Sequence, residues 1–431
     1  MRILFFSHYF PPEVNAPALR TYEHCARWVK AGHEVTVVTC VPNCPDGKAF
    51  AGYRNRLRRQ VETIDGIRVV RVWTYLAANA GTLRRILNYV SYFVSALLGS
   101  FRLGRADIVV ATSPQFFCGW AGAWAARLRR VPFVLEIRDL WPESIGAVDA
   151  IRNRPLLRFL EFLEKRLYRS AAHIVTVGDG YQARILEKAD VADRISVITN
   201  GVDLARFAAR SPDAEFLNEL GFAGKFTCSY VGTIGMAHGL EVVAEAARIL
   251  RDRGREDIRF CLVGDGAVRE RLTRLAAELG VNGSIVFAGR RPAESVPSIL
   301  ASSDACLIHL KECDLFETVI PSKMFEAMGM ARPIILGVRG DALAILRRAD
   351  AGLEMEPGSA ESLVSCVTRL ADDRALCSAL GARGRAFVEQ HYNRDRLAAE
   401  MLGILEGVAE AGRGRTLFAG SANPDNRTTR R

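Results

Sequence analysis

The sequence lacks the cysteine patterns of metal-binding and disulfide-rich proteins. Its ten cysteines are scattered along 431 residues, with no CxxC pair and no Cys/His spacing suited to zinc. We therefore expect reduced and mostly buried thiols in a cytosolic protein. No motif of paired carboxylates is present either, so we expect neither a metal nor another cofactor.

A membrane-spanning run is also missing. No stretch reaches the roughly 18 uncharged apolar residues of a span; the nearest, ILNYVSYFVSALLGSF at 86–101, is flanked by Arg84, Arg85, Arg102 and Arg105. This pattern predicts a core or interfacial helix. The opening MRILFFSHYFPP has no small-residue cleavage site, which favours a first core strand over a signal peptide.

Signatures of nucleic-acid binding are absent as well: there is no zinc pattern, aromatic RNA-binding motif or basic repeat. The net charge is nevertheless +10, with a sequence pI near 9.2. Such a balance favours an anionic partner. An anionic membrane surface or a phosphate-bearing substrate fits better than nucleic acid, and solubility alone is the alternative.

What is present is a regular alternation of strand and helix patterns. RILFFSH (2–8) is rich in β-formers, ALRTYEHCARWVKAG (18–32) has apolar residues at helical spacing, and HEVTVVT (33–39) is strand-like again. This order predicts a parallel βαβ unit. The alternation continues to residue 201, and a second series begins at 226. We predict an α/β fold of two doubly wound domains facing a cleft, with ligands at the carboxyl ends of the strands.

Breaks in this rhythm predict the domain boundaries. A first domain is expected over 1–205, a linker over 206–222 and a second domain over 223–388. From about Gly412 the chain is rich in Gly, Arg, Ser, Asn and Thr. Residues 412–431 are therefore expected to be a disordered tail.

The most specific motif is VIPSKMFEAMGMARPII, residues 319–335. A helix that begins at Pro321 or Ser322 would direct its first amides and positive dipole end toward an anion such as a diphosphate. Lys323 adds a positive charge where the dipole disfavours one, which indicates a ligand. Glu326, one turn further, can accept both hydroxyls of a ribose. A salt bridge between Lys323 and Glu326 is the alternative.

Glycine turns predict further ligand contacts. YVGTIGMAHG (230–239) and LVGDG (262–266) each link a strand to a helix, where glycine lets the backbone approach a phosphate or a sugar. His238 in the first turn is either a ligand group or a solvated surface histidine. Glycine turns of this kind are also common without function.

In the first domain, EIRDLWPES (136–144) carries Arg138, Asp139 and Glu143 from a strand end toward the cleft. These groups suit acid, base or acceptor-binding roles. Pairing of Arg138 with Asp139 or Glu136 is the competing interpretation. The loop HYFPPEVNAPALR (8–20) is expected to face the same cleft.

Taken in order, FPPE, RDLWPES, ITNGVDLARF, YVGTIGMAHGLE, LVGDG and PSKMFEAMGMARPII resemble glycosyltransferase family four, the retaining GT-B enzymes that use sugar nucleotides. The sequence is most similar to the bacterial subgroup that includes the L-fucosamine transferases of O-antigen and capsule synthesis. The resemblance implies two Rossmann-like domains, with the acceptor bound by the first and the donor by the second. It also implies a terminal helix, 389–411, that crosses back to the first domain.

The resemblance also implies roles for single residues. Glu326 corresponds to the ribose-binding glutamate, Lys323 and Ser322 serve the diphosphate, and the nucleotide base lies near Arg290. The expected donor contacts further include Gly232, Thr233, Gly235 and Gly264. The catalytic candidates are Lys323 and Asp139, and the acceptor candidates are His8, Glu13, Arg138 and Glu143.

Three positions depart from the family pattern. Thr318 stands where a first glutamate is common, with Glu317 one place away. Thr233 and His238 occupy the turn in which many members carry Arg and Lys, and the RDLWP turn replaces a usual histidine. Lys323 offers a substitute for the missing phosphate-binding charges.

The predicted function is transfer of a sugar, possibly an N-acetylated amino or deoxy sugar, from a UDP-sugar to a lipid-linked oligosaccharide in surface polysaccharide synthesis. Retention of configuration is implied by the resemblance. The protein is expected in the cytoplasm, peripheral at the inner face of the membrane. The alternatives are a UDP-sugar 2-epimerase-like enzyme and a catalytically silent nucleotide-sugar-binding protein.

Overall fold

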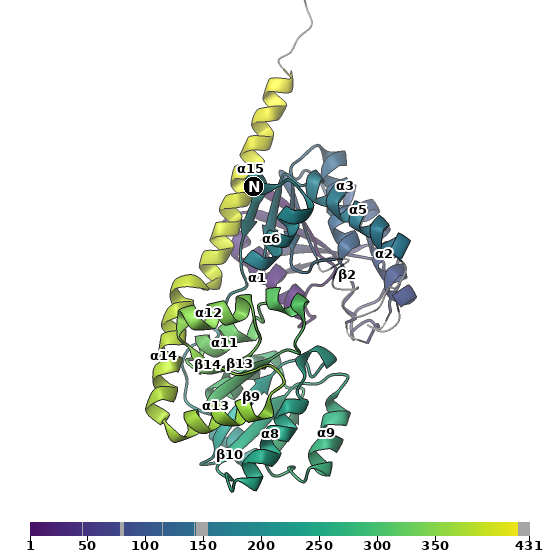
Figure 1. The fold of residues 1–431 in the computed structure, drawn as a ribbon. Coiled ribbons are helices and arrows are strands. Elements are labelled where there is room, and N and C mark those ends of the chain that lie inside the picture. The colour runs from purple at the N-terminus through teal and green to yellow at the C-terminus, as the bar shows by residue number, and fades with distance from the viewer. Residues whose placement is uncertain (45, 78–81, 114, 142, 144–153, 421–431) are drawn as a thin grey trace, which may run out of the picture. The chain divides into compact units, whose positions relative to one another are not determined.

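The computed structural model describes residues 1–44, 46–77, 82–113, 115–141, 143 and 154–420. It divides into two compact units (Figure 1). Unit 1 comprises Met1–Val177, Tyr181–Ile198 and Ala398–Arg431, and unit 2 comprises Gly178–Gly180 and Thr199–Leu397.

Unit 1 is built on an eight-stranded sheet in the order β3-β4-β2-β1-β5-β6-β7-β8. All neighbouring strands are parallel except β3 and β4, which form an antiparallel hairpin at one edge that the sequence analysis did not predict. The strands are β1 (Arg2–Phe6), β2 (Glu34–Cys40), β3 (Gln60–Ile64), β4 (Ile67–Val72), β5 (Ile108–Thr112), β6 (Phe133–Ile137), β7 (His173–Thr176) and β8 (Ile195–Val197).

Local signals explain the limits of the first helix. The Asn15 side chain caps it by accepting a 2.9 Å hydrogen bond from the Ala18 amide, and Pro17 occupies its first turn. The helix ends before Gly32, whose φ of +89° favours glycine. The helices of this unit are α1 (Ala16–Lys30), α2 (Thr82–Ser100), α3 (Phe116–Arg129), α5 (Arg154–Ser170), and most of α6 (Asp179–Lys188) and of α15 (Arg394–Gly420).

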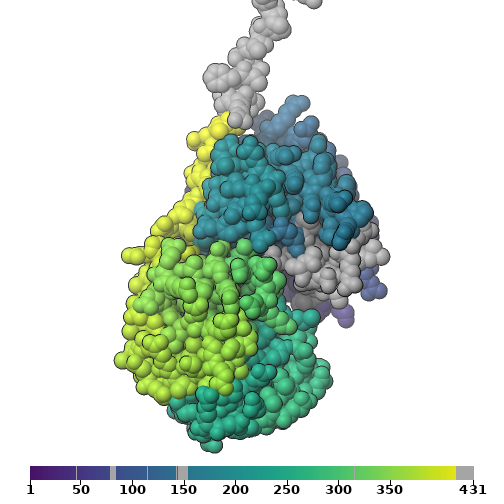
Figure 2. Space-filling view, in the orientation of Figure 1, coloured from purple at the N-terminus to yellow at the C-terminus, as the bar shows by residue number. Residues whose placement is uncertain are grey.

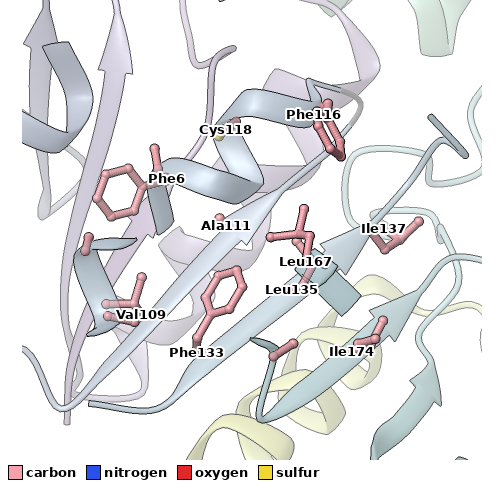
Figure 3. Packing of buried hydrophobic residues seen from close by; sticks show 14 of the residues in the cluster. Phe6, Val109, Ala111, Phe116, Cys118, Phe133, Leu135, Ile137, Leu167 and Ile174 are labelled. Atoms are coloured by element: carbon pink, nitrogen blue, oxygen red, sulfur yellow. The ribbon is translucent and has the colours of Figure 1, made fainter. Parts of the chain in front are cut away.

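The core of unit 1 lies between the central strands and the helices α2, α3 and α5. Figure 3 shows Val109, Phe133 and Leu135 from neighbouring strands gathered with Phe116 and Cys118 of α3. Every residue of β5 and β6 is buried. Near-continuous apolar runs are typical of parallel strands that helices cover on both faces.

Unit 2 contains a six-stranded, wholly parallel sheet in the order β11-β10-β9-β12-β13-β14. This is the strand order of a Rossmann sheet, and its switch point lies between β9 and β12. The strands are β9 (Phe226–Val231), β10 (Ile258–Val263), β11 (Ile285–Gly289), β12 (Ala305–His309), β13 (Ile334–Gly337) and β14 (Gly352–Glu354). The helices are α7 (Ala214–Glu219), α8 (Glu241–Asp252), α9 (Arg269–Glu278), α10 (Val296–Ala301), α11 (Lys323–Gly329), α12 (Asp341–Ala349), α13 (Ala360–Asp372) and α14 (Arg374–His391).

The predicted α/β class with two doubly wound sheets is confirmed, but two segments differ from the expectation. The expected linker, 206–222, contains α7, and Phe216 and Phe222 pack with Cys261 and Val263 in unit 2. Apolar side chains draw this segment into the domain. The expected terminal helix ended at 411, whereas α15 continues to Gly420; residues 421–431 lie outside the described residues.

The last helix contributes to unit 1 although it comes from the far end of the chain. Trp28 Nε1 of α1 donates to the Ala398 carbonyl at 2.9 Å, and His33 Nε2 lies 3.5 Å from the Glu406 carboxylate. In Figure 2 α15 (yellow) forms part of the molecular surface. Unit 1 is thus assembled from sequence segments that lie far apart.

All ten cysteines are free and eight of them are buried, which confirms that most of the thiols are buried as predicted. None of the helices in the described residues combines the length and the apolar character needed to cross a bilayer.

Candidate functional site

Two glycine turns meet at the carboxyl edge of the unit 2 sheet. Gly232 follows β9 with a φ of +146°, and Gly264 follows β10 with a φ of +137°. A Cβ on Gly264 would lie 1.9 Å from the Gly232 carbonyl oxygen, and one on Gly266 would lie 2.3 Å from that of Ile234. The turns therefore pack backbone to backbone, which glycine alone permits. They lie beside the switch point, where sheets of this type bind ligands.

Lys323 of α11 extends over the Gly232 turn. Its Nζ donates to the Tyr230 Oη at 2.8 Å and lies 4.0 Å from the centroid of that ring. Tyr230 Oη in turn donates to the Thr233 carbonyl at 2.7 Å. A Cβ on Gly232 would lie 2.8 Å from Nζ. The positive charge is thus held directly over the glycine backbone, at a place suited to an anion.

The half-buried position of Lys323 changes its protonation. Burial lowers the pKa of Lys323 to about 7, against an upward effect of the Glu326 carboxylate. Burial also raises the pKa of Tyr230, which stays neutral. Near neutral pH the ligand-free site therefore contains a mixture of ammonium and amine at Lys323.

This protonation predicts a pH dependence of nucleotide binding. An anionic diphosphate binds the ammonium form, so we expect the affinity to fall above about pH 7, by up to about tenfold per pH unit. Isothermal titration of UDP across this range measures the effect. Lys323→Met, which carries no charge at any pH, serves as the control and is expected to bind weakly with a flat profile. A flat profile for the unmodified protein would contradict the prediction.

His238 is a half-buried neutral group beside Lys323, so the alternative of a solvated surface histidine is wrong. Burial, aided by the Lys323 charge, lowers the pKa of His238 to about 4. Its Nδ1 is buried and finds no hydrogen-bond partner in the described part of the chain. Its carbonyl accepts a 2.6 Å bond from His309 Nδ1, and His309 Nε2 accepts one from the Gly358 amide at 2.8 Å. These partly buried hydrogen bonds fix this side of the turn.

The remaining predicted donor residues lie around the same edge of unit 2. Ser322 is the N-cap residue of α11, which begins at Lys323, one position later than the latest predicted start; the Ser322 side chain makes no capping bond. Glu326 is half-buried within the first turn of this helix. Arg290 is exposed directly after β11, and the Gly264 amide donates to the Gly289 carbonyl before it at 2.8 Å. Their contacts with donor phosphate, ribose and base stay predictions.

Two of the predicted acceptor residues are interior groups of unit 1. His8 packs edge-on against Tyr9, Tyr89 and Tyr92, and burial lowers its pKa to about 3. Glu13 Oε1 accepts hydrogen bonds from the Asn43 and Cys44 amides at 2.8 and 2.9 Å. Burial raises the pKa of Glu13, although these amides act against it. Glu13 ties the first loop to the loop that follows β2, whereas the His8 carbonyl accepts hydrogen bonds from Thr39 and Cys40 of β2 itself. Acceptor contact by either residue stays a prediction.

The RDLWPES segment is anchored by both its ends. Arg138 donates to the Pro17 and Ala16 carbonyls at 3.2 Å each, and the Asp139 carbonyl accepts a 3.4 Å bond from Ser113 Oγ. Glu143 lies 2.5 Å from Lys188 Nζ and 3.3 Å from an Arg184 nitrogen. Pro142 and Ser144 of this motif lie outside the described residues. The roles of Arg138, Asp139 and Glu143 toward an acceptor stay predictions.

Sequence reasoning missed two polar residues that organise these regions. Tyr230 positions Lys323 from a strand 93 residues earlier. Arg20 of α1 donates to the buried Glu136 at the end of β6, at 2.8 Å, and to the Ile198 carbonyl at 2.8 Å. Burial would raise the pKa of Glu136, but Arg20 and Arg138 outweigh burial and lower it. No sequence signal marked Arg20, and Tyr230 had none beyond its place before the glycine turn.

Comparison with known families matches each unit to a known protein domain. Residues 15–201 match the glycosyl transferase 4-like domain, and residues 225–373 match the domain of glycosyl transferases group 1. The chain belongs to the glycosyltransferases. One relative is the putative colanic acid biosynthesis glycosyl transferase WcaI of Escherichia coli K12, 24% identical over 94% of this chain and all of its own length. Another is the amylovoran biosynthesis glycosyltransferase AmsK of Erwinia amylovora, 22% identical over 95% of this chain and all of its own length.

Solved structures agree on the fold of this glycosyltransferase. Sucrose-phosphate synthase of Thermosynechococcus elongatus superposes with a TM-score of 0.72 at 18% identity, covering 97% of this chain and 100% of that chain. Anabaena HepE, solved with UDP-glucose, gives a TM-score of 0.68 at 16% identity, covering 95% and 99%. The predicted GT-B fold is confirmed. Among the described residues of this glycosyltransferase, no group of three His, Cys, Asp or Glu side chains is placed to hold a metal ion.

Proposed function

We propose that this glycosyltransferase moves a sugar from a UDP-sugar to a lipid-linked oligosaccharide during synthesis of a surface polysaccharide. The names of WcaI and AmsK, which refer to colanic acid and amylovoran, support the polysaccharide. HepE, solved with UDP-glucose, supports the donor class. The expected location is peripheral, at the inner face of the cytoplasmic membrane, where such an acceptor is anchored.

The observation that carries the proposal is the Lys323 ammonium held over the Gly232 backbone by Tyr230. When the bond between the anomeric carbon and the diphosphate breaks, negative charge develops on the departing UDP. A fixed ammonium and a closely approachable backbone stabilise that charge more than they stabilise the intact donor. This arrangement supplies positive charge from the protein, so the proposed reaction uses no metal.

The other groups have the following proposed roles. Glu326 accepts the ribose hydroxyls, and the backbone near Arg290 lies along the base. The acceptor hydroxyl oxygen forms the new bond to the anomeric carbon, UDP leaves with the electron pair of the broken bond, and the hydroxyl proton is lost. Asp139 orients that hydroxyl or takes its proton. Attack from the face that UDP leaves retains the anomeric configuration.

A thermal-shift experiment with UDP, GDP and ADP tests the donor site. At a hundredfold excess over its Kd, we expect UDP to raise the melting temperature of the unit that binds it by about 5–10 °C. Glu326→Ala removes the proposed hydrogen bonds to ribose and is expected to weaken UDP binding by about tenfold or more. A folded protein that responds to none of the nucleotides would overturn the proposed donor site.

A turnover experiment tests the rest of the proposal. Transfer requires that UDP be released from UDP-sugar only when a lipid-linked acceptor is present. An epimerase would instead convert the UDP-sugar without an acceptor, and a silent binding protein would release none. Either of these results would contradict the proposed transferase reaction.

A further inference from the structure

Exposed large apolar side chains are concentrated in unit 1. Among the described residues, fifteen of the sixteen belong to this unit, and Met236 is the exception. Leu87, Val90, Val94 and Leu98 recur at helical spacing along the outer side of α2. A regular exposed stripe of this kind indicates a contact with another apolar phase.

The stripe continues onto two neighbouring helices. α2 packs against α3, and α3 packs against α5, so that the three lie in one layer (Figure 1). Trp124 of α3 is 44% exposed, and Phe159 and Phe162 of α5 are 56% and 57% exposed. We call the outward side of α2, α3 and α5 the three-helix face.

The three-helix face is also strongly basic. Together α2, α3 and α5 contain nine Lys or Arg residues but only two acidic ones, Glu161 and the buried Glu164. Within the described residues, none of these nine basic side chains forms an ion pair, whereas Arg248 and Arg251 of α8 both pair with Asp252. Seven of the nine are exposed, whereas Arg85 donates to the Tyr89 hydroxyl and Arg129 to the Gly104 and Ser100 carbonyls. Most of the positive charge of these helices is therefore unpaired and exposed to solvent.

A groove of about 840 Å³ lies beside the carboxyl end of α2. Leu57, Leu98 and Phe101 provide its apolar lining, and Arg58 and Arg102 are basic residues on its wall. Arg59 fixes this wall by donating to the Gly99 carbonyl at 3.1 Å. Apolar surface next to exposed guanidinium groups fits a phosphate headgroup with its attached acyl chains.

We propose that the three-helix face, with this groove, docks the enzyme onto an anionic lipid bilayer. Basic side chains contact the headgroup phosphates while the apolar stripe enters the acyl boundary. A second copy is a poor occupant because it would bring two positively charged faces together. The inference rests on the proposed function only in placing the acceptor in such a bilayer.

Vesicle co-sedimentation of the full chain tests this docking. We expect the protein to bind vesicles of equal parts phosphatidylcholine and phosphatidylglycerol, and to stay in solution with phosphatidylcholine alone. Arg158→Glu with Arg166→Glu removes two attractions and adds two repulsions, which we expect to weaken binding by at least about tenfold. Phe159→Ser with Phe162→Ser changes only exposed apolar groups and is expected to weaken it comparably.

The matched control is Arg274→Glu with Arg369→Glu, which makes the same charge change at exposed positions of α9 and α13 in unit 2. We expect full vesicle binding by this variant. The proposal would be overturned if the control variant lost as much vesicle binding, or if the protein bound neutral vesicles equally well. It would also be overturned if the three-helix face instead formed a dimer or bound only an acidic protein. Transfer to a water-soluble acceptor separates the two inferences. If the proposed function is wrong, no transfer to this acceptor occurs. If only the docking is lost, transfer to this acceptor is unchanged.

Discussion

Lys323→Ala is expected to lower kcat by about 10²–10³ while the protein remains folded. The variant removes the ammonium that Tyr230 holds over the Gly232 backbone. This charge is needed most when the departing diphosphate gains its negative charge, so kcat falls more than donor affinity does. Steady-state kinetics with a UDP-sugar and a lipid-linked acceptor measure the change, and circular dichroism checks the fold.

Two further variants separate the effect of a nearby positive charge from the effect of its fixed position. Lys311→Ala removes an exposed lysine close to the same turns, and we expect it to have little effect on turnover because its ammonium is not fixed by Tyr230. Tyr230→Phe keeps the Lys323 charge but removes the oxygen that orients it, so an intermediate loss of kcat is expected. Unchanged turnover in Lys323→Ala would remove this lysine from the reaction.

Gly264→Ala is expected to destabilise unit 2 by about 3–5 kcal/mol. Its backbone has a φ of +137°, and the added Cβ would lie 1.9 Å from the Gly232 carbonyl oxygen. No flexible side chain can yield there, so one glycine turn must move away from the other. Thermal or urea unfolding measures the loss, and nucleotide titration measures the accompanying damage to the donor site.

Gly283→Ala is the control for this substitution. A Cβ there has no heavy atom within 4 Å, and its φ lies outside the region that favours glycine. We expect a change of about 0.5 kcal/mol or less. Equal stability of both alanine variants would contradict the close packing of the two turns.

The fold was largely predictable because the spacing of apolar residues and the glycines at the ends of helices and strands are local sequence signals. Buried parallel strands such as β5 and β6 stand out as apolar runs, and the helices between them carry regular apolar spacing. The β3–β4 hairpin was not predicted, because β3 alternates half-buried and exposed residues at a sheet edge and resembles a polar loop. α7 was assigned to a linker because six residues carry too little periodicity.

The residues of the candidate site were predictable only where the backbone conformation requires one residue type. Gly232 and Gly264 stand out because their turns require glycine. The environment of Lys323 depends instead on Tyr230, a partner on a distant strand. Likewise, the interior position of His8 arises from Tyr89 and Tyr92 on α2, which tertiary packing brings to it. Side-chain roles therefore need the assembled structure.

The contribution of α15 to unit 1 also affects the order in which the two units can be completed during translation. The first part of unit 1 ends at Ile198, and its last part begins only at Ala398. At about 5–20 residues per second, the intervening segment takes about 10–40 s to synthesise. During that interval Trp28 lacks its Ala398 partner. The amino-terminal unit is therefore begun first in translation and completed last, after the whole of unit 2 has emerged.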